Sequence, residues 1–166
     1  MNLLIVSFNI IFIGIGATLL IDLCAVLLKK LFNIPTLNYA LMGRWILIFL
    51  RFGKLKHQNI QQAPLQNFEH AFGWVIHYLI GIIFALCFIL MVGITWLSQP
   101  NLFPAICFGI TTVFFPFFIM QPCLGMGLFT SKMAEPWKAR LKSLLTHTLF
   151  GIGLFLSALI YQYLLI

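Results

Sequence analysis

The chain has 166 residues, of which 62% are hydrophobic and only 8% are charged, and its formal net charge is +7. A typical soluble domain is about 25% charged. This composition therefore excludes an ordinary soluble fold, because one core could not bury so much apolar surface and the remainder would cause aggregation. An integral membrane protein is the expected class.

Four apolar stretches are long enough to cross a hydrocarbon core about 30 Å thick, which takes roughly 20 helical residues. They cover approximately residues 3–28, 71–97, 103–131 and 143–166. Helix is the expected state, because an unpaired backbone amide in lipid costs several kcal/mol and the stretches lack the alternation of a membrane barrel. The sequence predicts an all-α, polytopic protein with four transmembrane helices and a single membrane domain over residues 1–166.

Charge placement predicts the orientation in the membrane. The ten Lys and Arg residues all lie in two connections, residues 29–70 and 132–142. The positive-inside rule makes both connections cytoplasmic and puts both termini outside. The first stretch has no basic n-region and is too long for a signal peptide, so we expect a retained anchor in a bacterial inner membrane. The positive charge then serves topology and membrane lipid, and no nucleic-acid partner is expected.

The first connection is predicted to contain a short helix. The run from Tyr39 to Phe52 is apolar apart from Arg44 and Arg51, which are seven residues apart and share a helical face. Fourteen residues are too few to span a bilayer. We expect an interfacial helix whose two arginines bind lipid headgroups; a shallow re-entrant segment is the alternative.

Signals on either side of this run predict the start of the short helix and the state of the chain after its end. Thr36 or Asn38 is a suitable cap for its first turn. The polar stretch over residues 54–64, which contains His57, is expected to be solvated.

Three of the four long stretches carry an ionisable residue on the helix face with the most small residues, and such faces pack against other helices. These residues are Asp22, His77 and His147, and the third stretch offers Gln121. At a rise of about 1.5 Å per residue, all four fit one layer in the cytoplasmic half of the membrane. We predict that they converge, with a carboxylate–imidazole contact within hydrogen-bonding distance.

Three functions are compatible with such a layer. The first is the relay or transport of protons or small solutes, in a homo-oligomer. The second is binding of a metal or haem by His77 and His147, with Asp22 beside them, because neutral imidazole is a ligand for Zn, Cu and haem iron. The third is a scaffold or partner subunit in which Asp22 pairs with a histidine only to lock helix packing.

Enzyme motifs give no further direction. The sequence contains no P-loop, no H-E-x-x-H, no G-x-S-x-G and no dinucleotide fingerprint. It therefore predicts no catalytic residue.

A series of short motifs occurs in order along nearly the whole chain. They are Gly14-Ile-Gly-Ala-Thr18 with Asp22, Pro35-Thr-Leu-Asn-Tyr39, Gly43-Arg-Trp45, Gly73-Trp74, His77-Tyr78, Pro116-Phe-Phe118, Met120-Gln-Pro122, and Ala139-Arg-Leu-Lys-Ser143 with His147. This series resembles an uncharacterised family of bacterial inner-membrane proteins, domain of unknown function 2938. The resemblance implies a four-helix membrane protein and supplies no activity, substrate or cofactor.

Overall fold

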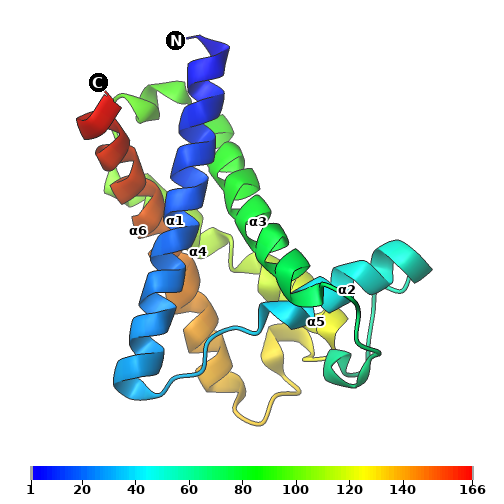
Figure 1. Cartoon of the computed structure of the whole chain (residues 1–166). Coiled ribbons are helices and arrows are strands. Elements are labelled where there is room, and N and C mark those ends of the chain that lie inside the picture. The colour runs from blue at the N-terminus through cyan, green and yellow to red at the C-terminus, as the bar shows by residue number, and fades with distance from the viewer. Residues whose placement is uncertain (1, 166) are drawn as a thin grey trace. The chain divides into compact units, whose positions relative to one another are not determined.

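The computed structural model describes residues 2–165, in which every regular element is helical (Figure 1). In chain order the elements are α1 (Leu3–Phe32), α2 (Tyr39–Phe52), η1 (Ile60–Gln62), α3 (Glu69–Val92), η2 (Ile94–Leu97), α4 (Leu102–Thr111), η3 (Pro116–Met120), α5 (Gln121–Leu124), η4 (Leu128–Thr130) and α6 (Pro136–Leu165). Element η3 is a π-helix, and the other short η elements are 3-10 helices.

Four helical stretches are long and apolar enough to cross a membrane. They are Leu3–Phe32, Glu69–Val92, Leu102–Leu124 and Pro136–Leu164. The predicted all-α, four-span architecture is confirmed, and the chain is a multi-pass membrane protein by the length and composition of its helices.

The chain forms two compact units, each assembled from segments far apart in the sequence. Unit 1 comprises Met1–Thr36, Tyr78–Thr112 and Thr146–Ile166, and unit 2 comprises Leu37–His77 and Val113–Leu145. The division passes through α3 and α6, so both helices contribute to both units. A single membrane domain over the whole chain stays a prediction.

The core of unit 1 depends on close approach between helix backbones. A Cβ added to Gly151 of α6 would lie 2.8 Å from the Cα of Ile106 in α4, and one added to Gly14 of α1 would lie 2.7 Å from the Cα of Ile82 in α3. Only glycine fits such contacts, which are typical of membrane helix pairs. The core there includes Ile13, Phe88, Phe150 and Leu154.

The N-terminal end of α1 and the C-terminal end of α6 lie at the same end of unit 1 (Figure 1). Element η2, which comes after α3, lies there as well, and the side chain of Gln162 in α6 donates a hydrogen bond of 2.9 Å to the carbonyl oxygen of Leu97. The N-terminus of α1, the connection after α3 and the C-terminus of α6 therefore share one end, as helices of alternating direction require.

In unit 2, α2 has the bounds that the sequence predicts. Asn38 caps it by accepting a hydrogen bond from the backbone N–H of Ala40 at 3.1 Å, and Gly53 ends it in a left-handed conformation with φ of 67°. A Cβ on Gly43 would collide with the carbonyl oxygen of Glu69, so α2 and α3 are in backbone contact. The predicted short helix is confirmed.

The segment after α2 is exposed at most positions, as predicted for a solvated stretch, but it is buried at Ile60 and half-buried at His57. Ile60 is only 1% exposed and packs with Trp45, Ile48, Cys123 and Leu124. The segment takes this course because hydrogen bonds fix its backbone. The indole N–H of Trp45 donates to the carbonyl oxygen of Leu55 at 2.8 Å, and the backbone N–H of His57 donates to the carbonyl oxygen of Cys123 at 2.9 Å. The prediction was wrong for Ile60 and for His57, which is half-buried.

The third membrane stretch is a broken helix. Its α4 part ends at Thr111 and its last turns are the π-helix Pro116–Met120 followed by α5. Proline has no N–H to donate, so Pro116 and Pro122 interrupt the regular hydrogen-bond ladder. Helix α5 ends at Leu124, before the Ser131 of the predicted stretch, and α6 begins at Pro136, inside the predicted second connection.

Candidate functional site

Within unit 1, Asp22 and Tyr78 form a hydrogen bond between α1 and α3. The tyrosine hydroxyl donates to a carboxylate oxygen of Asp22 at 3.0 Å, and both side chains are half-buried. A carboxylate in the apolar part of a span is costly unless it is paired or hydrogen-bonded. Tyr78 supplies such a partner.

His147 of α6 contacts Thr112, which lies directly after α4, also within unit 1. The Oγ1 atom of Thr112 lies 2.7 Å from Nδ1 of His147 and 2.6 Å from the carbonyl oxygen of Gly109. The hydroxyl carries one proton, so it cannot donate to both acceptors. When the threonine donates to Gly109, the Nδ1–H of His147 must donate to the threonine.

Within unit 2, His77 lies among aromatic side chains. Its Nε2 atom is 3.0 Å from the hydroxyl oxygen of Tyr39, and the two rings stack with centroids 4.3 Å apart. Trp74 packs on Tyr39 at a centroid distance of 4.5 Å. Tyr39 is the first residue of α2, so this cluster joins α2 to α3.

Gln121, at the junction of the π-helix and α5, also contacts a hydroxyl. Its Nε2 atom donates to Oγ of Ser143 in α6 at 3.2 Å. The side-chain carbonyl Oε1 is buried and has no hydrogen-bond partner in the part of the chain that the structure describes. A buried acceptor without a partner costs about 1–3 kcal/mol.

Each of the four predicted polar residues contacts a hydroxyl group. The sequence did not predict this shared feature. Asp22 and His147 have their hydroxyl partners in unit 1, and His77 and Gln121 have theirs in unit 2. Convergence of all four into one layer, with a carboxylate–imidazole contact, stays a prediction. The Tyr78 contact had one signal in the sequence. Tyr78 directly follows His77, so its predicted depth in the membrane could have been compared with that of Asp22.

The structure gives the metal-binding alternative no direct support. Among residues 2–165, no group of three or more His, Cys, Asp or Glu side chains lies close enough to hold a metal ion. A site made of His77, His147 and Asp22 stays an expectation of the sequence.

Arg44 has a different position from the predicted contact with lipid headgroups. Its side chain is 8% exposed, and its guanidinium group makes a two-pronged ion pair with Glu69, with N–O distances of 2.6 and 2.8 Å. The hydrogen bond with Glu69 raises the pKa of Arg44 above its ordinary value. An enclosed, paired guanidinium is not available to a phosphate, so the prediction for Arg44 is corrected. Arg51 is exposed and donates to Gln66 at 3.0 Å, and its headgroup role stays a prediction.

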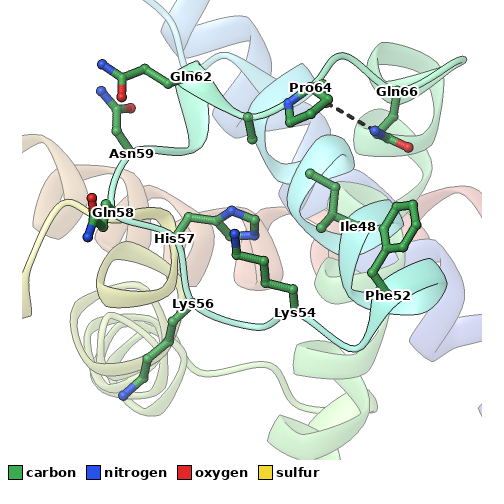
Figure 2. Close-up of a pocket in the computed structure, with 11 residues that line it drawn as sticks. Ile48, Phe52, Lys54, Lys56, His57, Gln58, Asn59, Gln62, Pro64 and Gln66 are labelled. Atoms are coloured by element: carbon green, nitrogen blue, oxygen red, sulfur yellow. Dashed lines mark hydrogen bonds between the residues drawn. The ribbon is translucent and has the colours of Figure 1, made fainter.

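A cavity of about 650 Å³ lies beside the C-terminal end of α2 within unit 2 (Figure 2). Its lining residues are Ile48, Phe52, Lys54, Lys56, His57, Gln58, Asn59, Gln62, Ala63, Pro64 and Gln66. Figure 2 shows the side chain of Lys54 extending toward the ring of His57, with the apolar side chains of Ile48 and Phe52 on the α2 side. The wall formed by the segment after α2 carries nearly all of the polar groups.

Among the residues that line this cavity, His57 has a buried ring nitrogen, Nε2, without a hydrogen-bond partner in the described chain. Burial, and then the positive charge of Lys54, lower the pKa of His57 below its ordinary value, while a hydrogen bond with the Lys54 backbone opposes them. The lowered pKa therefore favours the neutral form of the imidazole, which lies near the positive charge of Lys54.

A family model confirms the resemblance in the sequence. The model described as protein of unknown function (DUF2938) matches residues 11–161, which is nearly the whole chain. The chain belongs to this family. No curated protein and no solved structure matches it.

Proposed function

We propose that this member of the DUF2938 family relays protons through the paired polar side chains of its membrane spans. The observation that carries the proposal is the 3.0 Å hydrogen bond from the Tyr78 hydroxyl to Asp22. An ionisable residue inside a span is costly, and those that occur commonly mark ion pathways or proton relays.

The hydroxyl partners supply the chemistry that a relay needs. A hydroxyl both donates and accepts, so it takes up one proton while giving up another and ends unchanged. In the proposed step, Asp22 alternates between carboxylate and carboxylic acid, and Tyr78 remains a phenol throughout. The imidazoles of His77 and His147 are the other groups of the spans that can bind and release a proton, and each contacts a hydroxyl at 3.0 Å or less.

The proposal includes assembly of several copies, because four helices enclose little volume in one protomer. It places the relay in the half of the membrane that the distribution of Lys and Arg predicts to be cytoplasmic.

The same contacts are also compatible with a scaffold that has no chemistry. The two functions differ in what Asp22→Asn does. Asparagine keeps the shape and accepts the Tyr78 hydrogen bond, but it cannot exchange a proton. A scaffold tolerates the substitution, whereas a relay does not.

The test is proton uptake by liposomes of phosphatidylethanolamine and phosphatidylglycerol that contain the purified protein and an enclosed pH-sensitive dye. A potassium diffusion potential drives protons inward. We expect the wild type to exceed empty liposomes, and Asp22→Asn to reduce the rate by about tenfold or more. Gln162→Leu is the matched control, because it removes a polar side chain of α6 whose partner is the carbonyl of Leu97.

Two results would overturn the proposal. One is a folded wild-type protein that takes up protons no faster than empty liposomes, and the other is full activity in Asp22→Asn. An absorption spectrum of the same preparation tests the alternative, since a Soret band would select haem binding by His77 and His147.

A further inference from the structure

We propose that the cavity beside the end of α2 is a binding site for a phosphate-bearing anion. The site lies in unit 2, outside the polar pairs of the proposed relay, and its occupancy does not depend on proton transfer. Four observations carry the proposal: the charge of its lining, an unpaired imidazole nitrogen, a preformed wall and a partly apolar surface.

The lining is positively charged and contains no acidic residue. Lys54 and Lys56 belong to it, and Arg51 donates to the side chain of its member Gln66. The chain has three acidic residues, and the structure gives each a partner: Glu69 pairs with Arg44 and accepts from the backbone N–H of Gln66, Glu135 pairs with Lys138, and Asp22 accepts from Tyr78. The positive charge at the cavity therefore lacks a carboxylate partner in the described chain, as an anion site requires.

His57 supplies a directed contact in addition to charge. Its Nε2 atom is buried in the cavity wall without a partner among the described residues. A buried polar atom without a partner is unfavourable, and a bound ligand commonly satisfies it. When His57 is protonated, both of its ring nitrogens carry a hydrogen, and a phosphate oxygen can accept from Nε2–H. A bound negative charge favours this protonated form and offsets the effect of Lys54 on the imidazole.

The wall that carries these groups is fixed before any ligand binds. Nη1 of Arg44 donates to the carbonyl oxygens of Ile60, Gln61 and Ala63 at 3.2 to 3.3 Å. The Trp45–Leu55 and His57–Cys123 hydrogen bonds described above hold the same segment. A preformed wall lowers the entropic cost of binding.

The size and composition of the cavity indicate more than a bare phosphate ion. A volume of about 650 Å³ lies within the usual range of sites for small organic molecules. Ile48 and Phe52 give it an apolar side, and Phe52 is 71% exposed. The ligand class is thus a phosphate with a carbon body, and such a group belongs either to a phospholipid headgroup or to a soluble phosphate ester.

The experiment uses the full chain in a neutral detergent with two phosphate probes. Glycerol 3-phosphate is titrated by calorimetry, and phosphatidylglycerol is compared with phosphatidylcholine by native mass spectrometry. We expect saturable binding at one site for glycerol 3-phosphate, phosphatidylglycerol or both. The double variant Lys54→Gln/Lys56→Gln should weaken it about tenfold or more, since each basic residue contributes to anion affinity.

Lys30→Gln is the matched control, because Lys30 is an exposed lysine of α1 that does not line the cavity. Its affinity should stay within about twofold of the wild type. A second variant, His57→Gln, should weaken binding while helical circular dichroism stays unchanged.

The arms separate the two sources of the ligand. Binding of phosphatidylglycerol alone identifies a lipid headgroup, whereas binding of glycerol 3-phosphate identifies a soluble phosphate ester. The proposal is overturned if neither probe binds, if phosphatidylcholine binds as well as phosphatidylglycerol, or if Lys30→Gln weakens binding as much as the cavity variants.

Discussion

At the residue scale, the Arg44 side chain of α2 connects this helix to α3 and to the segment between them. All three of its nitrogens donate hydrogen bonds: Nε and Nη2 to Glu69, and Nη1 to three backbone carbonyls between α2 and α3. Arg44→Ala would leave the carboxylate of Glu69 enclosed without its cation. We expect the free energy of unfolding to fall by about 3–5 kcal/mol, measured by denaturant titration in detergent.

Arg51→Ala is the control for this experiment, because Arg51 is exposed and bonds to a neutral glutamine. It should cost less than about 1 kcal/mol. The double variant Arg44→Ala/Glu69→Ala should lose less than the two single losses added together, since its members share one interaction. Equal losses for Arg44→Ala and Arg51→Ala would show that the buried ion pair does not stabilise the fold.

His57 provides a pH-dependent contribution to stability. Burial and the charge of Lys54 lower its pKa in the folded chain, whereas the unfolded chain keeps the ordinary value of about 6.5. Below that value the unfolded chain binds more protons at this residue, so the contribution is complete above about pH 6.5 and is lost as the pH falls through the folded pKa.

The measurement is the melting temperature of the wild type and of His57→Gln in detergent, from about pH 7.5 down to about pH 5.5. We expect the wild type to lose stability relative to the variant as the pH falls. Subtracting the variant removes the titration of the other histidines. A difference that stays constant over this range would mean that His57 titrates alike in the folded and unfolded chains.

At the scale of elements, local signals predicted α2 and could not predict the segment after it. Asn38 and Gly53 bracket a fourteen-residue apolar run, and both act on backbone groups within one turn. The fold of residues 54–66 depends instead on partners distant in sequence, such as the Arg44 guanidinium and the Cys123 carbonyl. A polar, glutamine-rich composition indicates solvation when such partners are unknown, which is why the burial of Ile60 was missed.

The third span illustrates a break that sequence can locate but not describe. Pro116 and Pro122 each remove one N–H, and this marks a disturbance in the helix. Whether the helix kinks, ends or widens into a π-helix depends on packing around it. The earlier start of α6 had a local signal, because proline is favoured in the first turn of a helix and Pro136 stands there.

The polar residues of the spans were predicted by face and depth, and their partners were not. A helical period gives the face that points inward, and the distance from a charged end gives the depth. Neither quantity tells which residue of the neighbouring helix lies opposite. That is why Tyr78 and Thr112 appear only in the structure, beside Asp22 and His147.

At the scale of the whole molecule, the basic residues are absent from one end of unit 1. In unit 1 the N-terminal end of α1, the C-terminal end of α6 and η2 share one end (Figure 1), and no Lys or Arg of the sequence lies in these segments. All ten lie in the two other connections or in the helix ends that adjoin them. The arrangement thus fits the predicted orientation, with the uncharged end outside.

Single cysteines in a variant whose four native cysteines are replaced by alanine test this orientation in intact cells. Gln99, Gln58 and Glu135 are exposed, so substitution by cysteine should leave the fold intact at each position. We expect a membrane-impermeant maleimide to label Gln99→Cys in intact cells, and Gln58→Cys and Glu135→Cys only after the cells are opened, because the latter two lie in the connections that carry the basic residues. A permeant maleimide should label all three and serves as the control for accessibility.

Labelling of Gln58→Cys in intact cells, with Gln99→Cys protected, would show that the orientation is the opposite of the predicted one. Labelling of Gln58→Cys and Glu135→Cys on opposite sides would contradict four spans, because an even number of crossings must return the chain to the side it left.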